Sequence, residues 1–268
     1  MISDVLAEEI DIPLNEHYIL YFDVLGYKSF FESKPNEHKK FLIDMRLATS
    51  SIESIIRQAA TSIHVQLRTY SDNFLLYFEK NGVDEYEALK LLSVLARKIQ
   101  LLFLERCRIV VRGGITVGEF YADESIVFGQ GLIRAVELED KIAKNPRVVI
   151  DNNYFQETTR MLFQNRYLEK DTDDLYYVNY FYDKFSLRWA RGYCIYLVNH
   201  NCKYHPTVKD EAKILQQEKT ISKYLWMLVK FNEACRKTGN ESLQIDYKLT
   251  INERLLKLEV ACEDKTSK

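Results

Sequence analysis

The chain has 268 residues and a mass of 31.7 kDa, with 47% hydrophobic and 28% charged residues. This length and composition suit one large globular domain, or one domain with an extension, that buries a sizeable core. Lys and Arg number 37 against 39 Asp and Glu, which gives a net charge of −2. Because no overall basic field is available to hold duplex nucleic acid, we expect no nucleic-acid partner.

The cysteines and the N-terminal segment predict a cytoplasmic protein. The five cysteines are odd in number and form no CxxC pair, a pattern typical of reduced thiols. Residues 1–13 are acidic and lack the apolar stretch of a signal peptide. No segment approaches the roughly 18 uncharged apolar residues that a membrane span needs. We therefore expect no membrane partner.

Apolar periodicity predicts six elements in the first half of the chain. They are a strand at 17–24, a helix at 41–56, strands at 63–68 and 74–78, a helix at 91–102 and a strand at 108–118. Strands alternate apolar and polar side chains, whereas the helices repeat apolar residues every three or four positions. The order β-α-β-β-α-β is that of the ferredoxin-like fold, so the predicted class is α+β.

The second half of the chain predicts further elements and an extension. A helix is expected at 129–143, short strands at 147–150 and 176–181, and a long amphipathic helix at 209–236. We expect the core domain to comprise residues 1–185. Residues 186–268 then form a mainly helical C-terminal extension.

Two acidic residues lie where a carboxylate is costly. Asp23 interrupts the apolar run YILYFDVLGY, and Asp72 occupies the short turn before FLLYF, 49 positions later. In a ferredoxin-like sheet the first and third strands are antiparallel neighbours, so the end of the first lies beside the start of the third. Two adjacent carboxylates repel unless a proton or cation intervenes. Divalent ions that bridge them to substrate phosphates would explain the pair, and routine turn residues are the alternative.

The segment after Asp23 is a candidate phosphate site. Gly26, Tyr27 and Lys28 follow the strand and open the next helix, where backbone N–H groups can hold a triphosphate. Lys28 would add a positive charge nearby. The alternative is that Lys28 is an ordinary solvated surface lysine.

Four segments resemble successive motifs of class III nucleotidyl cyclase catalytic domains. They are FDVLGY, RTYSDNFLLYF, VRGGITVGEFY and FGQGLIRAVELE, within residues 17–150. The residues around Asp23 and the SDNF turn are the most specific. Within that class the chain looks most like the bacterial anti-phage pyrimidine cyclases, the Pycsar cyclases. Its short, divergent catalytic domain and the extension containing KYLWMLVKFN suggest this subtype.

The resemblance implies a class III nucleotidyl cyclase fold over residues 1–185 and a two-metal reaction. Asp23 and Asp72 would hold two Mg²⁺ or Mn²⁺ ions, with the Val24 carbonyl as a further ligand. A ribose 3′-hydroxyl would attack its own α-phosphate and expel pyrophosphate. The family also implies a homodimer with active sites at the subunit interface. Its cyclic product would be a second messenger in anti-phage defence that activates a separately encoded effector.

Departures from the purine-using cyclases indicate a pyrimidine substrate. Arg68 stands four residues before Asp72, where those enzymes typically have a base-reading Lys. Ile126 falls where ATP-using enzymes place an acidic acceptor for the adenine amino group, and an Ile cannot accept that hydrogen bond. The forked donors of Arg68 suit O2 and O4 of uracil, or O2 and N3 of cytosine. We expect UTP as substrate and cyclic UMP as product, with CTP, or less favourably a purine nucleotide, as alternatives.

A second departure concerns the transition state. Class III enzymes usually carry an Asn and an Arg four residues apart, and here those places hold Ile133 and Glu137. Arg134 is one residue away, which on a helix is a rotation of about 100°. Either the pyrimidine enzymes work without this pair, which we favour because both metal-binding Asp residues are kept, or the chain is a degenerate cyclase homologue that binds nucleotides without turnover. A ferredoxin-like protein–protein module without metal-dependent nucleotide binding is a separate alternative.

Overall fold

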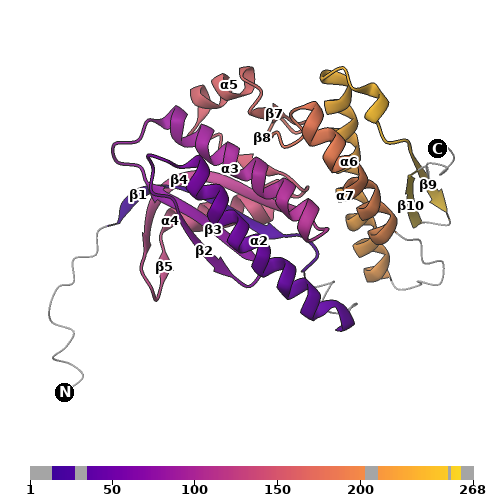
Figure 1. The fold of residues 1–268 in the computed structure, drawn as a ribbon, viewed down its shortest axis with the longest axis horizontal. Coiled ribbons are helices and arrows are strands. Elements are labelled where there is room, and N and C mark those ends of the chain that lie inside the picture. The colour runs from indigo at the N-terminus through magenta and orange to yellow at the C-terminus, as the bar shows by residue number, and fades with distance from the viewer. Residues whose placement is uncertain (1–13, 28–34, 203–210, 253–254, 261–268) are drawn as a thin grey trace.

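The computed structural model describes residues 14–27, 35–202, 211–252 and 255–260 (Figure 1). An eight-stranded sheet forms its centre, with β5 (Val127–Phe128) attached to β4. Its other strands lie in the order β2 (Gln66–Tyr70), β3 (Asn73–Glu79), β1 (Asn15–Val24), β4 (Val111–Ala122), β6 (Val148–Ile150), β8 (Tyr176–Val178) and β7 (Leu168–Lys170).

The predicted β-α-β-β-α-β core is confirmed. Helix α2 (His38–Ala59) lies between β1 and β2 in the chain, and α3 (Glu85–Arg106) lies between β3 and β4. Strand β1 pairs antiparallel with both β3 and β4, as a ferredoxin-like sheet requires. The fold is therefore α+β, with the first and third strands as direct neighbours.

The two faces of the sheet have different coverings. Because strand side chains alternate, Tyr18, Leu20 and Phe22 of β1 pack in a core with residues of α2 and α3. Ile19 and Tyr21 point to the opposite face, which packs against α4 (Gln130–Glu137). Figure 1 shows α2 and α3 together on one side of the sheet. The face beneath α4 carries Asp23 as well, since it alternates with Phe22.

Two glycines let neighbouring segments approach β4 closely. A Cβ on Gly113 would clash with the Tyr21 carbonyl of β1, and one on Gly114 would clash with Leu138. Leu138 begins η2 (Leu138–Ala143), a π-helical segment that continues α4. The glycine pair therefore fixes how closely β1 and η2 pack against β4.

The C-terminal part packs against the core domain and is not only helical. It contains α6 (Lys184–Asn201) and α7 (Glu211–Lys237), followed by a two-stranded sheet of β9 (Tyr247–Asn252) and β10 (Leu255–Val260). Leu25, Leu104 and Val110 of the core domain share one apolar cluster with buried residues of α6 and α7. The boundary at residues 185 and 186 stays a prediction, and the two parts share a core.

Some boundaries differ from the sequence prediction. Strand β2 begins at Gln66 rather than at Ile63, because the turn at 60–65 leaves Val65 bonded to the nearby Ile63 carbonyl. The helix expected at 129–143 is α-helical only to Glu137 and then widens into η2, which a 3.6-residue period cannot predict. Elements that apolar periodicity missed are η1 (Pro35–Glu37), α5 (Gln156–Gln164), β5, β7, α6, η3 (Glu241–Leu243), β9 and β10.

Within the described ranges, none of the helices combines the length and the apolar character needed to cross a bilayer.

The close packing at Gly114 gives a stability prediction. Gly114→Ala should lower the free energy of unfolding by about 1–3 kcal/mol, because the new methyl group overlaps Leu138. Gly192→Ala is the matched control, since a Cβ at Gly192 of α6 meets no atom within 4 Å. The control should be neutral or stabilising by up to about 1 kcal/mol. Urea unfolding followed by circular dichroism measures both, and equal midpoints for the two variants would contradict this packing.

Candidate active site

Asp23 and Asp72 meet at one end of the sheet, as the topology predicts. Asp23 is the Cα partner of Asn73 in the β1–β3 ladder, and Asp72 directly precedes Asn73. The Val24 N–H donates a hydrogen bond to the Asp72 carbonyl at 3.2 Å. Ser71 adopts a positive φ of 57° and closes the tight turn between β2 and β3. The β2–β3 turn therefore holds the Asp72 backbone against the end of β1.

The Asp23 carboxyl is electrostatically strained. Its side chain is 20% exposed, and its pKa is raised to about 7, chiefly by burial. The negative charges of Glu139 and Asp72 and a hydrogen bond with Asp72 contribute to this rise, whereas the positive charge of Arg112 opposes it. Near neutral pH, Asp23 therefore either retains a proton or needs a cation beside it.

Arg112 and Glu139 complete the charged cluster, and sequence reasoning missed both. Arg112 is the Cα partner of Asp23 on β4, and its Nε lies 4.0 Å from an Asp23 carboxylate oxygen. Its closer ion pair is with Glu139 of η2, a residue only 5% exposed whose pKa is raised by burial. A charged residue inside the apolar strand VVRGGITV, next to two glycines, was the signal for Arg112.

The residues at this end of β1 fit a divalent cation. Two carboxylates and the Val24 carbonyl are oxygen donors, the type that Mg²⁺ and Mn²⁺ prefer. Arg112 pairs more closely with Glu139 than with Asp23, and the raised pKa of Asp23 indicates that the described residues compensate its negative charge only in part. Among the described residues, no group of three or more His, Cys, Asp or Glu side chains is placed to hold a metal ion. An ion here would need ligands from substrate as well.

The predicted phosphate segment is described only in part. Gly26 is exposed with φ of 86°, a conformation that favours glycine, and it turns the chain out of β1. Tyr27 is half-buried, and its ring centroid lies 5.9 Å from that of Phe41 in the core. Lys28 lies outside the described residues. The role of this segment in phosphate binding stays a prediction.

Arg68 lies on the same face of the sheet as Asp23. It pairs with Leu75 of β3, which pairs with Tyr21 of β1, and residues paired in this way share a face. An Arg68 Nη2 hydrogen donates to the Asp123 carbonyl at 2.7 Å. Asp123 in turn accepts hydrogen bonds from Ser125 and Ile126 backbone N–H groups in the turn between β4 and β5. The structure thus brings the two proposed base-reading positions, Arg68 and Ile126, to one turn.

The Arg134 guanidinium is hydrogen-bonded to a carboxylate of its own chain. It donates two hydrogen bonds to the fully buried Asp151 carboxylate, from Nε at 2.7 Å and from Nη2 at 2.9 Å. These bonds hold the pKa of Asp151 below its usual range despite its burial. Thr116 of β4 donates to the same carboxylate at 2.8 Å. Arg134 therefore anchors α4 to Asp151, the residue that follows β6.

No protein-family model matches the chain, and no curated protein matches it significantly. Among solved structures, it is similar to the monomeric guanylyl cyclase domain of the RhoGC fusion protein from the aquatic fungus Blastocladiella emersonii. The identity is 12% and the TM-score 0.48, covering 62% of this chain and 95% of that one. The chain is also similar to the adenylyl cyclase CyaB from P. aeruginosa, with 11% identity and a TM-score of 0.44 over 61% of this chain and 93% of that one. A third similar structure is a class III adenylyl cyclase-like ATP-binding protein from Pseudomonas aeruginosa, with 15% identity and a TM-score of 0.42 over 67% of this chain and 40% of that one. Such distant likenesses assign no activity to this chain.

The raised pKa of Asp23 predicts that the stability difference between Asp23→Asn and the wild type depends on pH when a chelator keeps metal ions away. The unfolded chain loses the Asp23 proton near pH 3.8, whereas the folded chain keeps it to about pH 7. Between those values the folded state binds more protons, so Asp23 makes the protein less stable as pH rises. Asp23→Asn removes this cost. Its melting temperature should increasingly exceed that of the wild type from pH 4 to pH 7 and then stay level.

The control for this prediction is Glu79→Gln, which changes an exposed carboxylate at the opposite end of β3. Melting curves recorded in EDTA at several pH values measure both variants. A stability difference for Asp23→Asn that does not change with pH would contradict the electrostatic strain assigned to Asp23.

Proposed function

We propose that this protein is a cytoplasmic pyrimidine nucleotide cyclase that converts UTP to 3′,5′-cyclic UMP and pyrophosphate. The observation that carries the proposal is the meeting of Asp23 and Asp72 at the end of β1, with the Asp23 charge uncompensated. The four segments that resemble class III cyclase motifs support the same reaction. By that resemblance, the product is a second messenger of anti-phage defence that acts on a separately encoded effector.

The chain's own residues would hold and orient the reactants. The Asp23 and Asp72 carboxylates and the Val24 carbonyl would bind two Mg²⁺ or Mn²⁺ ions. Such ions, when bound, lower the pKa of the attacking 3′-hydroxyl and neutralise charge on the transferring phosphoryl group. That hydroxyl attacks the α-phosphate of the same nucleotide, and pyrophosphate leaves. No covalent bond to the protein forms. The proposed role of Gly26, Tyr27 and Lys28 is to bind the phosphates.

Base recognition is assigned to Arg68. Arg68 lies on the same sheet face as Asp23, and its guanidinium offers fixed, forked donors to the oxygen atoms of uracil. Ile126, 52% exposed at the adjoining turn, offers no side-chain acceptor for the amino group of adenine. CTP is the alternative substrate, because O2 and N3 of cytosine also accept hydrogen bonds.

A homodimer with interfacial active sites is the proposed assembly. Four large apolar side chains are exposed on β5, α4 and the turn before β5: Ile126, Phe128, Ile133 and Val136. Several exposed apolar side chains on consecutive segments favour a protein interface. Because Ile126 stands in the turn that contacts Arg68, a second copy bound there would lie beside the proposed base site.

A nucleotide-binding protein without turnover is the second candidate. The commitment of Arg134 to Asp151, together with Ile133 and Glu137 at the usual Asn and Arg positions, favours it. The two candidates differ in one measurable property. Both predict metal-dependent UTP binding, but only the cyclase releases pyrophosphate.

Removing one carboxylate tests the proposed metal site. Asp72→Ala should lower cyclic UMP formation by more than about 100-fold, because a metal ligand is lost. Its melting temperature should remain close to that of the wild type, since Asp72 lies in a turn and packs no core. Glu79→Ala removes an exposed carboxylate from the far end of β3 and should keep full activity. Turnover that survives in Asp72→Ala would rule out the site assignment.

Arg68→Lys tests base recognition separately from metal binding. Loss of the forked donors should raise KM for UTP by about tenfold and change the UTP to CTP preference. The Mn²⁺ concentration for half-maximal activity should be unchanged. Arg57→Lys, at an exposed position of α2, is the control. If the nucleotide profile of Arg68→Lys matches the wild type, Arg68 has no part in reading the base.

A further inference from the structure

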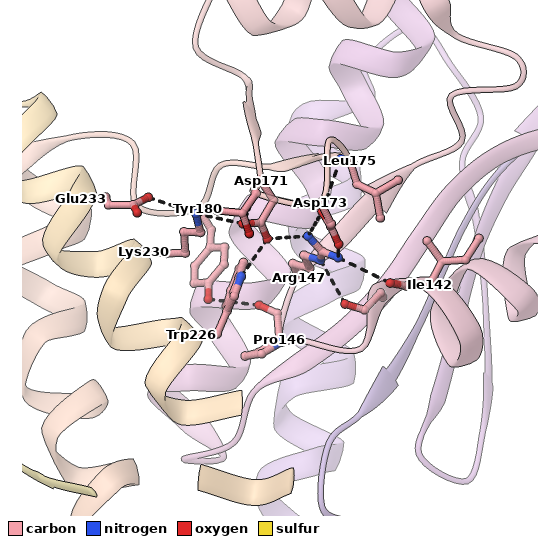
Figure 2. Close-up of polar contacts among 12 residues, drawn as sticks. Ile142, Pro146, Arg147, Asp171, Asp173, Leu175, Tyr180, Trp226, Lys230 and Glu233 are labelled. Atoms are coloured by element: carbon pink, nitrogen blue, oxygen red, sulfur yellow. Dashed lines mark hydrogen bonds and ion pairs between the residues drawn. The ribbon is translucent and has the colours of Figure 1, made fainter. Parts of the chain in front are cut away.

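The C-terminal helix α7 is fastened to the core domain by buried polar contacts. Trp226 Nε1 donates to an Asp171 carboxylate oxygen at 2.8 Å, and Lys230 Nζ lies 3.0 Å from the other oxygen (Figure 2). Asp171 and Lys230 are each only 7% exposed. Their burial in a satisfied ion pair fixes the rotation of α7 about its axis, because both α7 side chains must face Asp171.

The same cluster reaches η2, which carries Glu139. Arg147 pairs with both Asp171 and Asp173, and its Nε donates to the Ala143 carbonyl at the end of η2 at 3.0 Å (Figure 2). Arg147 is 1% exposed. The position of α7 is therefore tied through one buried guanidinium to the segment that holds Glu139 beside Arg112.

Apolar packing places α7 at the end of β1. Leu25, which follows the proposed ligand Val24, lies in one buried cluster with Ile221 and Tyr224 of α7. Trp226 packs against the cluster that contains Leu138, the first residue of η2. The middle of α7 thus shares apolar clusters with residues next to both segments that carry the acidic groups of the candidate active site.

Lys223 is the charged residue that α7 presents there. It precedes Trp226 by three residues and Lys230 by seven, so all three share one face of the helix. Lys223 is half-buried and makes no hydrogen bond or ion pair with any other residue in the described part of the chain. The charged groups that act on it are Asp23, Glu139, Arg112 and Lys219.

The balance of these charges leaves the Lys223 ammonium uncompensated. Burial and the positive charge of Arg112 lower its pKa, and the Asp23 and Glu139 carboxylates oppose this only in part. Arg112 already pairs with Glu139. Once divalent ions neutralise Asp23 and Asp72, Lys223 and Arg112 would face further positive charge. A polyanion at the site would relieve this repulsion.

We propose that Lys223 binds the β- and γ-phosphates of the nucleoside triphosphate at the Asp23–Asp72 site, so that the C-terminal helix completes the active site. The inference deepens the proposed function and rests on it. The ammonium would hold the pyrophosphate group while it leaves. Trp226, Lys230 and Asp171 act as positioning residues, because they fix the face of α7 that carries Lys223.

The test is isothermal titration calorimetry of the full chain with inorganic tripolyphosphate in excess Mn²⁺. This probe contains neither base nor ribose, so it reports phosphate binding without turnover. Lys223→Ala should weaken binding by about tenfold or more, as expected for loss of a charged hydrogen-bond donor. Lys223→Arg should restore most of the affinity. Lys213→Ala, an exposed lysine nearer the start of α7, should bind like the wild type. Lys223→Met retains most of the apolar stem and guards against loss of packing as the cause.

Each outcome separates the inference from the proposed function. Wild-type binding that is lost in Asp23→Asn and weakened in both Lys223→Ala and Lys223→Met would support both. Equal binding by the wild type and Lys223→Ala would overturn the role of Lys223 and leave the metal site in place. Tighter binding by Lys223→Ala would also overturn it, because Lys223 would then compete with the metal for Asp23. If the wild type binds no Mn²⁺–tripolyphosphate, the inference is wrong, and Mn²⁺-dependent UTP binding then decides whether the proposed function fails with it.

Discussion

The antiparallel pairing of β1 with β3 is the constraint on which the proposed site depends. It sets Asp23 opposite Asn73 and so puts the Asp72 turn against the end of β1. Close packing of β4 on β1, which Gly113 permits, brings Arg112 opposite Asp23 from the other side. The strand pairing therefore holds charged side chains close together at this end of β1. The resulting electrostatic strain on Asp23 is the basis of the cation site proposed at this end of β1.

Periodicity and topology are sufficient to predict much of the fold and the acidic pair from the sequence. The ferredoxin-like order, helices α2, α3 and α7, and the meeting of Asp23 with Asp72 all come from local apolar patterns joined by one rule about neighbouring strands. Arg112, Glu139 and Lys223 were missed because their placement depends on side-chain packing between distant segments. The widening of α4 into η2, where Leu138 packs on Gly114, is likewise invisible to a 3.6-residue period. Short strands such as β7 carry too few residues to show a period.

The C-terminal extension is more closely integrated with the core domain than its sequence indicated. The sequence predicts a long amphipathic helix, and Trp226 and Lys230 turn one face of α7 toward the buried Asp171. Asp171 is also bonded to Arg147, so the core domain and α7 share one network of buried ions. Breaking such a network leaves a buried charge unpaired, which is strongly unfavourable. This explains why α7 can hold a lysine in a defined position beside the site.

The most direct test of the central claim is a product analysis with the purified full chain. The protein is incubated with ATP, GTP, CTP and UTP together in Mn²⁺, and the products are resolved by liquid chromatography and mass spectrometry. We predict cyclic UMP with an equal amount of pyrophosphate, and none of either with Asp23→Asn. Cyclic AMP or cyclic GMP as the main product would contradict the assignment of Arg68 and Ile126. Absence of both product and Mn²⁺-dependent UTP binding would contradict the cyclase assignment itself.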